Sequence, residues 1–157
     1  MSTLPLLLLT LSCQTDPAAR AATTYINQLQ PLLQENGLLA EHVLFQAAAI
    51  YNKADRQGDV AKAWSTSVVP LAEHLYDQST FIEPPEQWVS SHDELVEIWG
   101  VRAQAYRNIS EGLQMADQEA WESGRLQAQT ATQKEELWFD QVNTIIAPMG
   151  FLIDAYP

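Results

Sequence analysis

The chain has 157 residues, of which 46% are hydrophobic, and it carries a net charge of −12 with only 6 Gly and 8 Pro. That apolar content suffices for a core, so the composition excludes an acidic disordered chain, and the low Gly and Pro content argues against a turn-rich β fold. A surface this acidic repels phosphate backbones and anionic headgroups, which argues against nucleic-acid and peripheral lipid binding. Its simplest role is solubility.

The first residues form a short apolar segment. Residues 4–11 are apolar except for Pro5 and Thr10. A helix needs roughly 20 such residues to span a hydrocarbon core, so this run is too short for a membrane span and matches the apolar part of a secretion signal. The run ends in Leu11, Ser12 and Cys13, the chain's single cysteine. Residues 14–157 therefore lack both an internal disulfide and a thiol nucleophile.

This N-terminus resembles the lipobox of bacterial lipoproteins. The resemblance implies export, cleavage before Cys13 and acylation of that cysteine, and thus a lipid-anchored domain of residues 14–157 in the bacterial cell envelope, on its periplasmic or extracellular face. The segment departs from the pattern at Thr10, where Leu is usual, and in having no Lys or Arg before the apolar run. The alternative is that residues 1–13 are a buried or frayed end, with Cys13 as a small core residue.

Hydrophobic spacing predicts a long first helix over about 17–56. Asp16 and Pro17 suit its N-cap and first turn. Pro31 and Gly37 interrupt the pattern without changing its register, which favours one bent helix over two separated near 36–37. The predicted buried positions are Ala22, Tyr25, Leu29, Leu32, Asn36, Leu39, Val43, Gln46, Ile50 and Lys53.

A second helix is predicted over 59–79, following the helix stop at Gly58 and bent by Pro70. Its predicted buried positions are Trp64, Val68, Leu71, Leu75 and Gln78. The segment 80–85 contains two consecutive prolines and predicts a linker, because the residue before each proline disfavours helical geometry.

The last two helices have the most regular spacing. The first of them, over 85–116, has predicted buried positions Trp88, His92, Leu95, Trp99, Arg102, Tyr106, Ile109, Leu113 and Ala116. A turn capped by Asp117 leads into a helix over 118–147 with predicted buried positions Trp121, Gly124, Ala128, Ala131, Glu135, Trp138, Val142, Ile145 and Met149. The apolar tail after Gly150 is expected to dock on the bundle.

Short connections place consecutive helices antiparallel, so the sequence predicts an all-α fold, an up-down-up-down bundle of four helices with a long, bent first helix. About 40 residues of helix span roughly 60 Å and about 20 span roughly 30 Å, so the first two helices cannot match in length. Three outcomes are open: the first half folds back near Gly37, it projects toward the anchor, or the linker and tail cover it.

Polar residues within the apolar seams are the candidate site. Arg102 and Glu135 lie at similar depth on either side of the turn at Asp117, and His92 shares the seam of Arg102. The structural interpretation is a buried ion pair that sets helix register. The functional interpretation is a small-ligand site around His92, Arg102 and Glu135. Core packing is the default interpretation of Trp88 and Trp138, and the alternative is an aromatic pocket that they form with the tail.

Motifs for catalysis or metal binding do not stand out in the sequence. The histidines are His42, His74 and His92, and none has a Glu three residues before it, as diiron bundles require. No nucleophile elbow or phosphate-binding glycine loop is found. We therefore expect no metal, no cofactor and no enzymatic activity. The predicted function is that of a helical envelope lipoprotein acting as a spacer or through contacts with an envelope protein, the alternative being the ligand-binding bundle.

Overall fold

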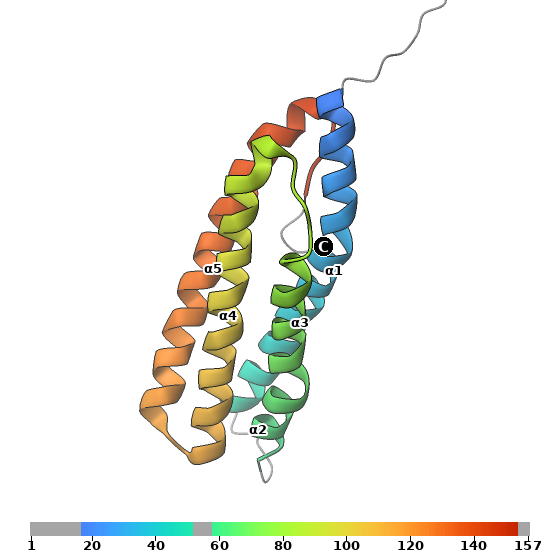
Figure 1. Cartoon of the computed structure of the whole chain (residues 1–157). Coiled ribbons are helices and arrows are strands. Elements are labelled where there is room, and N and C mark those ends of the chain that lie inside the picture. The colour runs from blue at the N-terminus through green and yellow to red at the C-terminus, as the bar shows by residue number, and fades with distance from the viewer. Residues whose placement is uncertain (1–16, 52–57, 154–157) are drawn as a thin grey trace, which may run out of the picture.

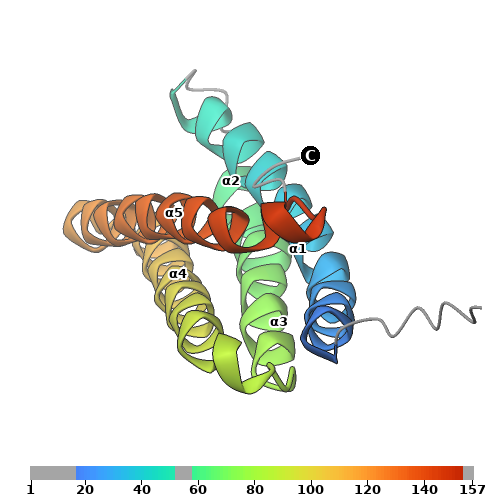
Figure 2. The ribbon, with the colours of Figure 1, turned by 90° about the horizontal axis from the view of Figure 1, so that it is seen from above.

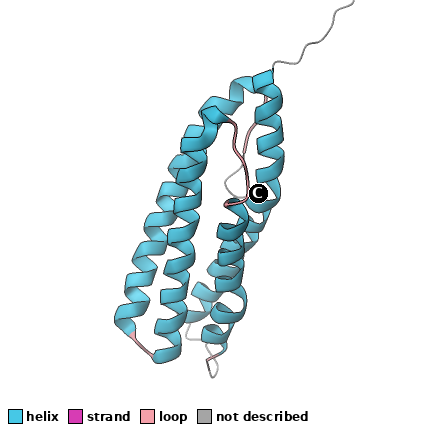
Figure 3. Ribbon diagram, viewed as in Figure 1, coloured by secondary structure: helices cyan, strands magenta, loops and turns pink. Residues whose placement is uncertain are grey.

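The computed structural model describes residues 17–51 and 58–153, and this part of the chain is all-helical, with no strand among the described residues (Figure 3). Helix α1 spans Pro17–Tyr51, and α4 and α5 span Val89–Met115 and Gln118–Ile146. Between them, α2 (Asp59–Ala63), the π-helix η1 (Trp64–Val68) and α3 (Val69–Ser79) follow one another without a gap. A short 3-10 turn, η2 (Glu86–Trp88), precedes α4, and a second one, η3 (Ala147–Met149), follows α5. Residues 1–13, on which the lipobox resemblance and the predicted acylation of Cys13 rest, lie outside the described residues.

The four helical segments alternate in direction, which confirms the predicted four-helix bundle (Figure 1). Helices α4 and α5 pack together over most of their lengths, α3 packs against α4, and α1 packs against α3. Seen from above, α3 therefore lies between α4 and α1 (Figure 2). None of the described helices is both long enough and apolar enough to cross a membrane.

Helix α1 continues through both Pro31 and Gly37. Pro31 has no backbone N–H, so the carbonyl of Asn27 has no donor within the helix. Both residues are exposed, so this carbonyl can bond to water instead. The prediction of one long, bent helix is thus confirmed, and Figure 1 shows its lower half leaning behind α3. Its end at residue 56 falls outside the described residues.

The tail and the residues around Trp88 and His92 lie against the first half of α1, so of the three outcomes left open by the sequence, cover by the tail is the one observed for the described residues. Tyr25 packs against Trp88 of η2, with ring centroids 5.6 Å apart. On the other side, Ile153 is buried, and its backbone N–H and carbonyl each bond to the side chain of Asn143 at 2.8 Å. The docking of the tail is confirmed. The less covered half of α1 is the second one, because residues 40–50 of this helix are all exposed or half-buried.

The segment around Pro70 is the main local departure from the sequence prediction. A proline ring clashes with the carbonyl four residues earlier, and the wider π-helix before it relieves that clash. The hydroxyls of Ser65 and Thr66 both donate to the carbonyl of Lys62 at 2.9 Å, which satisfies an acceptor in the widened turn. Ala72 and Ser79 are buried here, Leu71 is half-buried against the core, and Gln78 is exposed, so the predicted burial of Gln78 was wrong.

The helix ends agree with the sequence at one site and differ at another. Asp117 caps α5 as predicted: its Oδ1 accepts from the backbone N–H groups of Glu119 and Ala120 at 3.0 and 3.1 Å. The α-helix expected from 85 begins at Val89, because the preceding residues form the 3-10 turn η2. Near the end of α5, Ile145 is 51% exposed and Ile146 is buried instead, so that predicted position was wrong.

Helices α4 and α5 approach each other closely at Gly124. A Cβ atom at this position would lie 2.8 Å from the carbonyl oxygen of Ala105 and 2.9 Å from the backbone nitrogen of Ile109. Backbone atoms cannot move aside as a side chain can, so the two helices would have to separate. A glycine is therefore required here for packing.

We expect Gly124→Ala to lower the free energy of unfolding by up to about 2 kcal/mol, since overpacking costs about 1–3 kcal/mol and the gain in helix propensity returns about 1. Urea unfolding followed by circular dichroism measures the change. Gly100→Ala is the matched control, because its Cβ would meet only the ring of Tyr76, which is 38% exposed and can rotate. The control should be neutral or stabilising, and equal losses in both variants would refute the packing argument.

Candidate functional site

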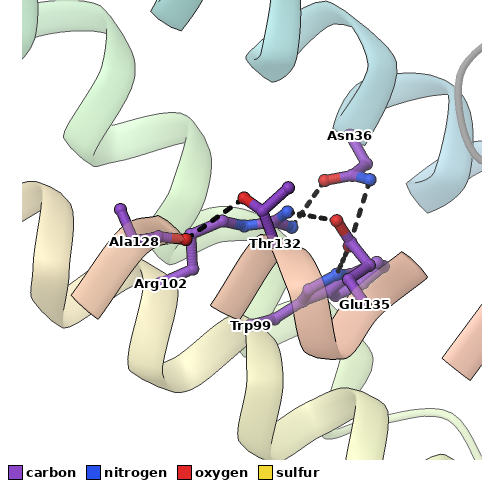
Figure 4. A network of polar contacts seen from close by, with 6 residues as sticks. All are labelled: Asn36, Trp99, Arg102, Ala128, Thr132 and Glu135. Carbon is purple, nitrogen blue, oxygen red and sulfur yellow. Dashed lines mark hydrogen bonds and ion pairs between the residues drawn. The ribbon is translucent and has the colours of Figure 1, made fainter. Parts of the chain in front are cut away.

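The most polar part of the core is a network of four side chains, Asn36, Trp99, Arg102 and Glu135, which we call the polar network (Figure 4). Arg102 donates from Nη1 to Oε2 of Glu135 at 2.6 Å and from Nη2 to Oδ1 of Asn36 at 2.5 Å. The other carboxylate oxygen of Glu135 accepts from the indole N–H of Trp99 at 2.6 Å and from Nδ2 of Asn36 at 3.2 Å. The sequence argument paired Arg102 with Glu135, and the structure brings these two together.

Burial makes the polar network energetically important. Glu135 is 0% exposed and Arg102 is 4% exposed. Removing charges from water costs several kcal/mol per ion, and only close pairing and further hydrogen bonds offset this cost. Here both carboxylate oxygens and two guanidinium nitrogens have partners. The network therefore ties α1, α4 and α5 together at one level of the bundle.

Two members of the polar network were not singled out as site residues from the sequence. Asn36 and Trp99 were placed on the buried faces of their helices, but nothing in the spacing showed that they would meet Arg102 and Glu135. The available signal was a single Asn within the apolar face of the first helix. An amide at such a position needs a buried partner of its own, and Arg102 and Glu135 supply it.

His92 lies apart from the polar network, near the start of α4. Its Nε2–H donates to the carbonyl of Ser79 at 3.0 Å, and its Nδ1 then accepts from the hydroxyl of Tyr25 at 3.0 Å. Burial lowers the pKa of His92, which the bond to Ser79 and the nearby charge of Asp93 partly oppose. Burial also raises the pKa of the Tyr25 hydroxyl, so it stays protonated and keeps donating. His92 thus joins α1, the end of α3 and α4 in its neutral form.

This arrangement predicts a pH dependence of stability. Because the folded-state pKa of His92 is lowered, the unfolded chain takes up the proton first, so stability falls as the pH drops below about 6.5. We expect His92→Gln to be less stable than the parent at neutral pH but to show a flatter decline between pH 7.5 and pH 5. Urea titrations across that range test this, with His42→Gln, at an exposed position, as the control. An unchanged slope in His92→Gln would refute the assignment.

Trp88 and Trp138, the two indoles of the suggested aromatic pocket, both belong to the core. They are 3% and 0% exposed, respectively. Trp88 packs on Tyr25, and the indole N–H of Trp138 donates to the carbonyl of Ser91 at 2.6 Å. Trp138 also contacts Phe139 edge to face, with ring centroids 5.3 Å apart. Both side chains therefore hold α4 to its neighbours.

Metal-binding geometry is absent from the described residues: no group of three or more His, Cys, Asp or Glu side chains among residues 17–51 and 58–153 could hold a metal ion. Two of the three histidines, His42 and His74, are exposed. His74 lies 3.4 Å from the carboxylate of Glu35. This contact is at the surface and contributes little to stability.

Comparison of the chain with protein-family models, with curated proteins and with solved structures found no match.

Proposed function

We propose that this chain is a non-catalytic interaction protein of the bacterial cell envelope, tethered to a membrane through an acyl group on Cys13. The lipobox-like end of the apolar run, Leu11-Ser12-Cys13, supports the tether. The rigid bundle supports a role in presenting a surface, because its buried charges bond to one another and fix the helices in place. The net charge of −12 favours a partner that is a protein with basic groups over an anionic lipid surface.

The observation that carries this proposal is a group of exposed apolar side chains on the second half of α1. Leu38, Leu44 and Phe45 are 54%, 70% and 72% exposed. Leu38 and Phe45 are seven residues apart and therefore share one face of the helix, with Leu44 beside them. Single exposed apolar residues are ordinary, whereas a group on one helix face suits contact with an apolar strip of a partner. We call these three residues the α1 patch.

The test of the α1 patch is site-specific crosslinking in bacterial cells that produce the full chain. A photoreactive residue replaces Phe45, and the matched control carries it at Gln28, an exposed position on the first half of α1. We expect one protein partner, identified by mass spectrometry, from position 45 and not from position 28. The purified partner should bind the purified chain directly, and Phe45→Ser should weaken that binding about tenfold or more, as loss of a buried aromatic anchor does.

Two results would contradict the interaction proposal. One is the same crosslinking pattern at positions 45 and 28, which would show random collision. The other is direct binding that Phe45→Ser leaves unchanged while thermal unfolding shows the variant folded. Because Phe45 is largely exposed, its replacement should not alter the fold.

The tether has its own test. An alkyne analogue of palmitate should label the full chain and should not label Cys13→Ser, and the labelled protein should be in the membrane fraction. Unlabelled chain in the soluble fraction, with residues 1–13 still present, would contradict lipidation. The test of the α1 patch does not depend on the result of this labelling experiment.

Binding of a small ligand directly by His92, Arg102 and Glu135 has less support. The bonded atoms of all three side chains already have protein partners, and a ligand would have to displace them. Displacing partners from buried charges costs several kcal/mol, which a small ligand would have to offset.

A further inference from the structure

A cavity of about 280 Å³ lies beside the polar network, between the second half of α1 and the first half of α5. Its walls are mainly apolar and aromatic, and they include Val43, Ile50, Trp64, Tyr106 and Trp121. Figure 4 shows Ala128 and Thr132 on α5 next to Arg102, and these two residues also line the cavity. The cavity therefore lies near the polar network, but none of the network's four residues lines it.

Two hydrogen-bond donors among the lining residues have no protein acceptor. The indole N–H of Trp64 is buried and has no partner within the described part of the chain. The hydroxyl of Tyr106 likewise forms no hydrogen bond to any described residue, although Tyr106 is only 6% exposed. A buried donor without a partner costs about 1–3 kcal/mol, and the other buried indole N–H groups of α4 and α5, on Trp99 and Trp138, both have acceptors. The exception lies at this cavity.

Trp64 and Tyr106 adjoin each other at the wall of the cavity. Trp64 is the first residue of the π-helix η1. The ring of Trp64 meets that of Tyr106 edge to face, with centroids 5.4 Å apart, so the two unpaired donors belong to adjoining side chains. Burial raises the pKa of Tyr106, which keeps the hydroxyl protonated and able to donate.

The ligand chemistry follows from the walls and the donors. A volume of about 280 Å³ is at the lower end of the range for small-molecule sites and holds roughly nine or ten non-hydrogen atoms, at about 30 Å³ for each water-sized group. The unpaired groups are both donors, so they call for an acceptor. Arg125 at the edge of the cavity is already paired with Glu122 at 3.0 Å, which leaves little to favour an anion.

We propose that this cavity binds a small, uncharged and mostly apolar molecule through one oxygen atom that accepts a hydrogen bond from the hydroxyl of Tyr106, with the ring of Trp64 forming part of the wall. The bulk of the molecule packs against the aromatic and aliphatic walls, and its single oxygen accepts from the Tyr106 hydroxyl, which has no protein acceptor among the described residues. This site is distinct from the α1 patch and depends on neither a membrane tether nor a protein partner.

The test compares two probes of the same shape with the full chain in solution. Acetophenone has a carbonyl oxygen where α-methylstyrene has a methylene group. Binding is followed by two-dimensional ¹⁵N–¹H NMR of the indole N–H groups, with the Trp64 signal assigned by its loss in Trp64→Phe. We expect a saturable shift of the Trp64 signal with acetophenone and a dissociation constant about two- to tenfold lower than that of α-methylstyrene, the effect of one neutral hydrogen bond.

Three variants sharpen the result. Tyr106→Phe keeps the ring and removes the hydroxyl, so it should reduce the preference for acetophenone. Ala47→Phe places a ring in the cavity and should abolish the binding of both probes, whereas Ala48→Phe, at the neighbouring exposed position, should leave binding unchanged. Unfolding curves show whether each variant is folded.

Several outcomes would overturn the proposal. Shifts that grow linearly with both probes would show non-specific association. Equal affinities for the two probes would show that the oxygen is not recognised. Binding that survives Ala47→Phe in a folded variant would place the ligand elsewhere, and the absence of any shift would mean that the cavity holds only water.

Discussion

Arg102→Met should lower the free energy of unfolding by about 3–5 kcal/mol, because it leaves the carboxylate of Glu135 buried without its cation. Glu135 is 0% exposed, so water cannot replace the lost partner without rearrangement of the core. Asn36 loses its bond to Arg102 as well. Urea unfolding at neutral pH measures the loss, and the single variant Glu135→Gln should also be destabilised, because it leaves Arg102 charged and without a counter-ion.

The double variant Arg102→Met with Glu135→Gln separates the ion pair from the rest of the polar network. It removes both charges but keeps an amide oxygen that can accept from the indole N–H of Trp99. We expect it to be more stable than the sum of the two single changes allows, since a buried pair replaced by neutral groups is often nearly neutral. Additive losses would show that the two charges do not stabilise each other.

Trp138→Ala should lower the free energy of unfolding by about 3–5 kcal/mol, the usual range for removing a large aromatic side chain from a core. The indole is 0% exposed, and its N–H bonds to the carbonyl of Ser91 on α4. The variant therefore leaves a cavity between α4 and α5 and removes the hydrogen bond that joins them at this level. The unfolding midpoint in urea gives the size of the loss.

The neighbouring residue supplies the control for this change. Leu137 precedes Trp138 on α5 and is 60% exposed. Leu137→Ala removes an apolar side chain from the same helix and should change stability by no more than about 0.5 kcal/mol. A large loss in Leu137→Ala would mean that the exposed face of α5 packs against something, and a small loss in Trp138→Ala would mean that the core can collapse around the missing ring.

The sequence predicted one part of the candidate site and missed another. The spacing of Arg102 and Glu135 about the turn at Asp117 predicted that the two charges lie at the same depth, because two antiparallel helices pair residues symmetrically about their connection. It could not bring in Asn36, because the position of α1 relative to α4 and α5 depends on packing over long sequence distances. For the same reason, the cavity beside Trp64 and Tyr106 was not foreseen.

The sequence by itself determined the helices, their alternating directions and most of their buried faces, since hydrophobic periodicity and capping residues act within a few residues of one another. The tertiary structure alone decided two features. These are the packing of the tail and of Trp88 against the first half of α1, and the cavity beside the polar network. Each depends on how side chains from distant segments fill the same space, and no local pattern records that.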